Sequence, residues 1–201
     1  MAYEGDEFSP TYEKACIAHA NSSVVRRGGE LRLKFKNGRS TIYKDNWGKA
    51  TCEVGNNACE RYVLYDYFPE HGSFLVHVAY WETQGWFLVS QLDGKVEKIV
   101  AAPGYSPKRK WLASVYGTEG PDDANNGIDI VPARLHPTES AFHYRPKDYE
   151  LWEFVGWDTD DRLLLRVTWQ VGEELVTWPA EAVRLNGEWQ LNRWAPTSSR
   201  P

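Results

Sequence analysis

Apolar and polar side chains alternate along much of the chain, beginning near residue 30. Leu31, Leu33 and Phe35 alternate with Lys and Arg residues up to the dipeptide Asn37-Gly38, and the alternation resumes after it. Alternation on both sides of Asn-Gly is typical of a β-hairpin, and this dipeptide favours a type I′ turn. The cationic positions of the first strand are expected to face solvent or to protect an exposed edge.

Two longer segments repeat this pattern. Four apolar runs are separated by turns rich in Gly, Pro and Asp, and they lie at 62–68, 73–81, 86–92 and 96–100. A second set follows residue 149, with turns at 158–161, 172–173 and 186–187. Short runs at this spacing predict antiparallel meanders. The one helix candidate is 10–21, with one or two turns.

Residues 101–117 link the two sets. Pro103-Gly104 ends one strand, Ser106-Pro107 begins a turn, and apolar alternation resumes after it. The basic residues 108–110 form the tip of this turn, which either is solvated or binds an anion. Together these patterns predict an all-β protein with little helix. We expect a single β domain over 1–201, with an irregular segment at 1–28 and a sheet core at 29–201.

Composition supports this fold class and narrows the function. Ten Trp and eleven Tyr occur among 201 residues, and both residue types favour strands. The net charge of −5 argues against nucleic acid as a partner, because phosphate binding needs a basic surface. The chain contains no apolar run of the length that a membrane span needs. Its polar first residues lack the apolar stretch of a signal peptide, so the protein is cytoplasmic or is an exported form whose signal was removed.

The segment "GWFLVSQLDGKVEKIVAAPGYSPKRKWLASVY" carries a resemblance. With "YVLYDYF" before it and "NNGIDIV" after it, residues 58–170 resemble uncharacterised bacterial envelope proteins with partial or irregular β-propeller-like folds. This resemblance implies three to four blades, or two packed sheets, and a periplasmic or envelope location. The common Ser-Pro-Asp-Gly turn of such blades reads Ser106-Pro107-Lys108-Arg109 here, so its Asp and Gly are missing.

The three cysteines allow two interpretations. Cys52 and Cys59 flank a polar loop containing Gly and Asn, which suits a small disulfide-closed loop, although two buried thiols are the alternative. The envelope location that the resemblance implies favours the disulfide. Cys16 either packs as a small apolar residue or acts as a nucleophile, which would need a neighbouring base.

An acidic loop at 120–130 is a candidate calcium site. Asp122, Asn126 and Asp129 would supply oxygen ligands, with a turn glycine between them. Ala124 and Ala133 occupy positions where a helical calcium loop has ligands, so the match is partial. The alternative is a solvated acidic loop. The turn at 158–161 has the same two interpretations, and no other cofactor is expected.

The sequence contains no Gly-x-Ser-x-Gly, His-Glu-x-x-His or phosphate-binding glycine motif, and its histidines are dispersed. We therefore predict a non-enzymatic binding protein, such as an inhibitor or immunity protein that blocks a bacterial toxin or hydrolase. The alternatives are an envelope domain that binds a glycan or small ligand, and a hydrolase on the same scaffold. The candidate partner-binding residues combine an acidic loop with aromatic anchors: Asp122, Asp123, Asn125, Asn126, Trp81, Trp86 and Tyr116.

Overall fold

A computed structural model describes residues 10–48, 52, 59–81, 83–119, 126–133, 141–146, 149–171 and 173–194. The chain falls into two compact units. The first contains α1 (Pro10–His19), η2 (Asn21–Ser23), β1 (Val24–Arg27), β2 (Glu30–Lys34), β3 (Ser40–Lys44), β4 (Arg61–Phe68), β5 (Ser73–Ala79), β6 (Gln84–Ser90) and β7 (Val96–Ile99).

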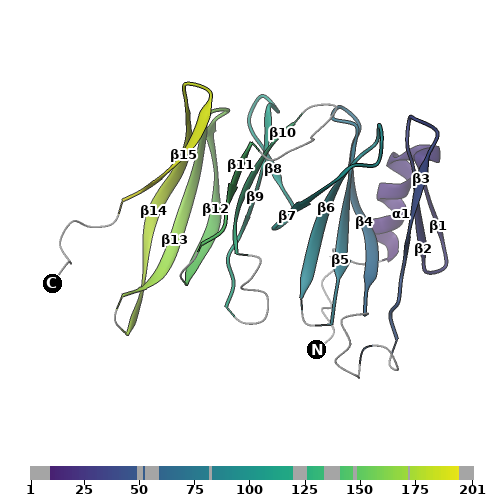
Figure 1. Ribbon diagram of the computed structural model, residues 1–201, viewed down its shortest axis with the longest axis horizontal. Helices are drawn as coiled ribbons and strands as arrows, with labels where there is room; N and C mark the ends of the chain where they lie inside the picture. The colour runs from purple at the N-terminus through teal and green to yellow at the C-terminus, as the bar shows by residue number, and fades with distance from the viewer. Residues whose placement is uncertain are drawn as a thin grey trace. The chain divides into compact units, whose positions relative to one another are not determined.

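The second unit contains β8 (Gly104–Tyr105), β9 (Trp111–Tyr116), β10 (Gly127–Pro132), β11 (Phe142–Tyr144), β12 (Glu150–Thr159), β13 (Arg162–Val171), β14 (Glu174–Leu185) and β15 (Glu188–Arg193). In both units the strands form antiparallel sheets in which sequence neighbours pair, in the order β1-β2-β3, β4 to β7, β8 to β11 and β12 to β15 (Figure 1). The predicted all-β class is confirmed. The single domain and the propeller-like arrangement stay predictions.

Two packed sheets form the core of the first unit. Leu31 and Leu33 are fully buried on one face of the β1–β3 sheet, and they belong to one apolar cluster with Leu64, Phe74 and Val76 of the β4–β7 sheet. Strands β4 to β7 correspond to the four apolar runs predicted from sequence. The alternation along β2 is therefore explained by one buried face and one exposed face.

The predicted short helix is present as α1, and an ion pair fixes it to the sheets. Pro10 occupies the first turn, where a missing N–H carries no penalty. Glu13 accepts hydrogen bonds from Arg26 Nη2 of β1 over 2.6 Å and from Leu64 N of β4 over 2.9 Å. A single carboxylate therefore links the helix to both sheets of the first unit.

The hairpin at Asn37-Gly38 is present, but the predicted turn type is wrong. Among loop residues 36–38, all of which are described, only Gly38 has a positive φ, of 82°. Gly38 N donates to Phe35 O over 3.0 Å, and Phe35 N donates to Arg39 O over 2.9 Å. This is a three-residue loop with glycine in the left-handed region, because a type I′ turn would need positive φ at both central residues.

A two-residue turn with the positive φ values of type I′ lies instead between β14 and β15. There Asn186 and Gly187 have φ values of 52° and 92°.

The second unit has a separate core. Ile128 and Ile130 of β10 are fully buried and cluster with Trp152, Leu163 and Leu165 of the β12–β15 sheet. All six residues of β10 are buried, so both of its faces are covered. No helix among the described residues meets the length and hydropathy of a membrane span.

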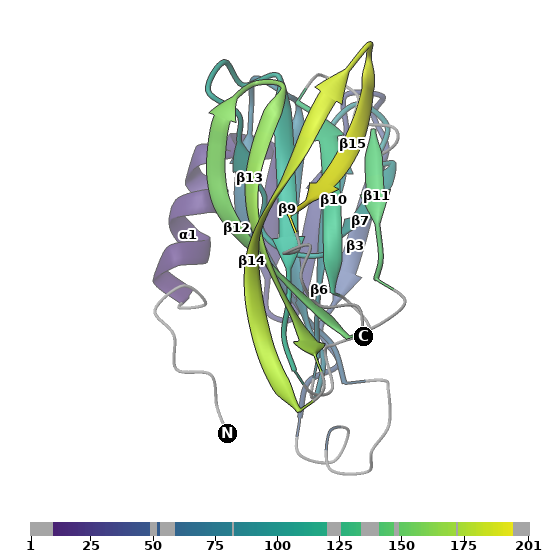
Figure 2. The ribbon, with the colours of Figure 1, turned by 90° about the vertical axis from the view of Figure 1, so that its left-hand side faces the viewer.

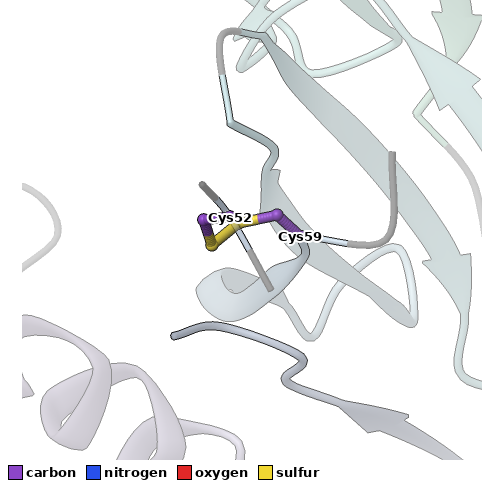
Figure 3. The surroundings of a disulfide bond; sticks show 2 residues. All are labelled: Cys52 and Cys59. Carbon is purple, nitrogen blue, oxygen red and sulfur yellow. A yellow bond between two sulfur atoms is a disulfide. The ribbon is translucent and has the colours of Figure 1, made fainter. Parts of the chain in front are cut away.

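The predicted disulfide is confirmed: Cys52 and Cys59 are bonded, and both are buried (Figure 3). Cys16 has a free thiol, which donates to Tyr65 O over 3.1 Å. Burial, followed by the charge of Asp66, raises the pKa of this thiol. Because a protonated thiol is a poor nucleophile, this environment favours the packing role for Cys16 over the nucleophile alternative.

Candidate functional site

A cavity of about 480 Å³ lies at one end of the β12–β15 sheet, and it is lined by Tyr149, Glu150, Trp169, Gln170 and Arg193. Strand pairing brings these residues together, because Glu150 lies opposite Trp169 on neighbouring strands. Cross-strand partners project from the same face of a sheet. Figure 2 shows β13 and β14 running side by side to this end of the sheet, where β13 ends at Val171 and β14 begins at Glu174.

A buried carboxylate lines the cavity. Glu150, which is 8% exposed, accepts from Arg193 Nη1 through Oε1 over 2.5 Å. Its Oε2 accepts from Tyr144 Oη over 2.8 Å and from Trp152 Nε1 over 3.1 Å. Since a buried carboxylate is stable only when paired, these contacts fix Glu150, and Glu150 in turn positions Arg193.

Two aromatic rings hold the Arg193 guanidinium. Its centre lies 5.2 Å from the Tyr144 ring and 5.3 Å from the Trp152 ring, and Nη2 also donates to Tyr144 Oη. Burial, together with the hydrogen bond to Glu150, raises the pKa of Tyr144 to about 12. Tyr144 therefore stays a neutral donor to Glu150 at physiological pH.

A tryptophan pair lies beside this network. The Trp169 and Trp178 ring centroids are 4.0 Å apart, and their planes are inclined by 35°. Trp169 is opposite Val176 and Trp178 is opposite Val167, so both indoles project from the face that carries Glu150. The pair provides an apolar surface next to charged donors and acceptors.

A second charged cluster lies on the other face of β11. Asp129 is fully buried, and its Oδ1 is 2.7 Å from Nδ1 of the exposed His143. Its Oδ2 accepts from Arg145 Nη2 over 2.9 Å and from Val100 N over 3.1 Å. These donors occupy both oxygens of a residue that the sequence suggested as a calcium ligand.

Asn126, another proposed calcium ligand, closes the base of the acidic loop. Its side-chain oxygen accepts from Thr118 N over 2.8 Å, and its amide donates to Thr118 O over 2.9 Å. Asp122, Asp123 and Asn125 lie outside the described residues. In the parts of the chain that are described, no group of three or more acidic, His or Cys side chains is arranged to hold a metal, and the calcium site stays a prediction.

The proposed aromatic anchors separate into three environments. Trp81 is 54% exposed after β5, as an anchor requires. Trp86 is 6% exposed, and its ring lies 4.6 Å from His77 and 4.8 Å from Tyr65, so it belongs to the interior and is not an exposed anchor. Tyr116 is partly buried at the end of β9.

Sequence reasoning missed Glu150, Trp169 and Arg193. The short turn at 160–161 would not have revealed them, because register shifts at Phe154/Gly156 and at Trp157/Thr159 lie between this turn and the pair of Glu150 with Trp169. No known family model, curated protein or solved structure matches the chain.

Proposed function

We propose that this protein is a non-enzymatic binding protein whose cavity at Glu150, Trp169 and Arg193 takes a neutral sugar ring. One observation carries this proposal: a tilted tryptophan pair, with ring centroids 4.0 Å apart, lies beside a charge-balanced carboxylate and guanidinium. A sugar has both features that such a site recognises, since its C–H face packs on an aromatic ring and its hydroxyls need donors and acceptors.

The ion pair favours a neutral ligand over a charged one. The charge of Arg193 is compensated by Glu150 over 2.5 Å, so an anion would gain little net attraction there. The two described hydrogen bonds of Arg193 use two of the five N–H groups of a guanidinium, which leaves donors for hydroxyl groups.

The test is a titration of the protein with neutral mono- and oligosaccharides, in which binding is measured by calorimetry and by tryptophan fluorescence. Trp169→Ala is expected to weaken binding about tenfold, the equivalent of one lost aromatic contact. Trp81→Ala is the matched control, because it removes an exposed indole from the other unit. The absence of saturable binding, or equal losses in the two variants, would refute the sugar site.

A second candidate function is the capture of another protein, as the sequence predicted for an inhibitor or immunity protein. The exposed indole of Trp81 supports it, since large aromatic side chains dominate interface energies. For this function Trp81→Ala, and not Trp169→Ala, is expected to speed dissociation from a toxin or hydrolase partner. Gel filtration and surface plasmon resonance with secreted bacterial hydrolases would detect such a complex.

The disulfide supports an oxidising compartment. Disulfides persist in the periplasm and outside the cell, whereas cytosolic thiols are kept reduced. We therefore assign the protein, as part of this proposal, to the periplasm or envelope. Fractionation of the native host, with thiol trapping before lysis, would test the assignment.

A further inference from the structure

Positive charge is concentrated in one segment of an otherwise acidic chain. Residues 26–44 contain seven Lys or Arg residues and one acidic residue, Glu30, although the formal net charge of the chain is −5. This segment forms β1, β2 and β3. The chain is acidic overall, but this part of its first unit is basic.

Strand alternation places most of this charge on the outer face of the β1–β3 sheet. Leu31 and Leu33 are buried, whereas Arg32 and Lys34 of the same strand are exposed. The side chains that share this outer face by register are Val25, Arg27, Glu30, Arg32, Lys34, Ser40, Ile42 and Lys44. Arg26 is on the opposite face, where Glu13 and Asp45 neutralise it.

The cationic groups of the outer face surround a shallow hollow. A cavity of about 220 Å³ is lined by Val25, Arg27, Glu30, Arg32 and Lys34. Lys44 Nζ lies 3.0 Å from Glu30 Oε1 and compensates its charge. Among the described residues, no ion pair involves Arg27, Arg32 or Lys34.

The spacing of these cations matches that of an extended peptide. Arg32 and Lys34 are two residues apart on one strand, so their Cα atoms are separated by about 6.8 Å. Arg27 lies opposite Glu30 and hence diagonally from Arg32, at about 7–8 Å. Alternate side chains on one face of an extended acidic peptide have the same repeat of about 6.8 Å.

We propose that the outer face of the β1–β3 sheet binds an extended segment of another protein with carboxylates at alternate positions. Arginine pairs with planar carboxylates through two parallel N–H groups, which suits Arg27 and Arg32 to Asp or Glu. Glu30, Val25 and Ile42 separate the cationic groups on this face, so it fits carboxylates spaced along a chain better than a uniformly charged polymer.

The test uses a fluorescent peptide of alternating Glu and Thr, with anisotropy measured at low and physiological salt. Saturable binding that weakens with salt is expected. A second peptide carries the same number of Glu residues at every third position, which places successive carboxylates on opposite faces of an extended chain. It is expected to bind more weakly, and equal binding would overturn the spacing argument.

Two double variants locate the site. Arg32→Gln/Lys34→Gln is expected to weaken binding about five- to tenfold, as the loss of two exposed ion pairs predicts. Lys95→Gln/Lys98→Gln makes the same charge change at two exposed positions, one just before β7 and one within it. Its affinity for the peptide is expected to stay within about twofold of that of the native protein. The proposal would be overturned if both double variants lost the same affinity, or if no saturable binding were seen. It would also be overturned if polyphosphate or phosphatidylglycerol vesicles bound more tightly than the alternating peptide.

Discussion

Ser106 donates its hydroxyl to Asp160 Oδ1 over 2.8 Å, although 54 positions separate the two residues. The same carboxylate oxygen accepts from Lys108 N over 2.8 Å, and Ser106 Oγ accepts from Trp111 N over 3.1 Å. A carboxylate from the β12–β13 turn therefore holds the turn between β8 and β9, where the sequence lacks the local Asp of Ser-Pro-Asp-Gly.

Asp160→Asn is expected to lower the free energy of unfolding near neutral pH. Desolvation opposes ionisation of this side chain, but the hydrogen bonds from Lys108 and Ser106 and the lysine charges outweigh it and lower the pKa of Asp160 below 3.8. The stability it contributes is thus present above this value and is lost as the pH falls through the lowered pKa. Urea denaturation across acidic pH would measure this.

The control for this prediction is Asp158→Asn, which changes an exposed carboxylate on the same hairpin. It is expected to have little effect, as exposed ion pairs usually do. Equal stabilities of Asp160→Asn and the native protein near neutral pH would contradict the role assigned to Asp160.

Removal of the disulfide is expected to destabilise the first unit. Cys52→Ser/Cys59→Ser should lower the free energy of unfolding by about 2–3 kcal/mol, because the unfolded chain regains the entropy of an open loop. Thiol titration of the denatured native protein should find Cys16 alone. Three reactive thiols would show that the bond does not form.

Alkaline pH is expected to unfold the protein through its tyrosines. Burial is the largest cause that raises the pKa of Tyr12, Tyr43 and Tyr144 from 10.0 to about 12. Between these values the unfolded chain loses protons that the folded chain retains, so stability falls as pH rises through this window. Phenolate absorbance and denaturation should change together, whereas titration of every tyrosine near pH 10 in a folded protein would contradict this prediction.

Gly117 is expected to tolerate no side chain. A Cβ at this position would overlap Trp152 N and lie 2.7 Å from Leu151 C, both in the backbone where β12 begins. Gly117→Ala should therefore cost about 1–3 kcal/mol, the usual range for overpacking. At Gly48 an added Cβ meets no atom within 4 Å. Gly48→Ala should therefore change the free energy of unfolding by no more than about 0.5 kcal/mol, as measured by thermal or urea denaturation.

Alternation predicted the strands well because most of them have one buried and one exposed face. It failed for the turn at Asn37-Gly38, since a dipeptide does not reveal whether one or both residues take positive φ. The sequence places Asp129 in an acidic loop, whereas the structure places it in a buried strand between Ile128 and Ile130. A charge at such a position requires a partner, and this requirement was the overlooked signal.

The cavity was harder to predict, because its residues come from separate strands. Arg193 and Glu150 are 43 positions apart, and they meet only when the register of the β12–β15 sheet is known. Periodicity shows which face a side chain occupies. It does not show which side chains meet across a sheet of several strands.

The sequential strand order has a consequence for synthesis on the ribosome. In each sheet the strands that pair are neighbours in sequence, so we expect the sheet to form as its own segment emerges. The inner face of the β8–β11 sheet, however, is covered by β12–β15, which is translated last. A nascent chain that stalls before Glu150 would therefore expose Ile128 and Ile130 to other stalled chains, and such truncated products are expected to aggregate unless a chaperone covers them.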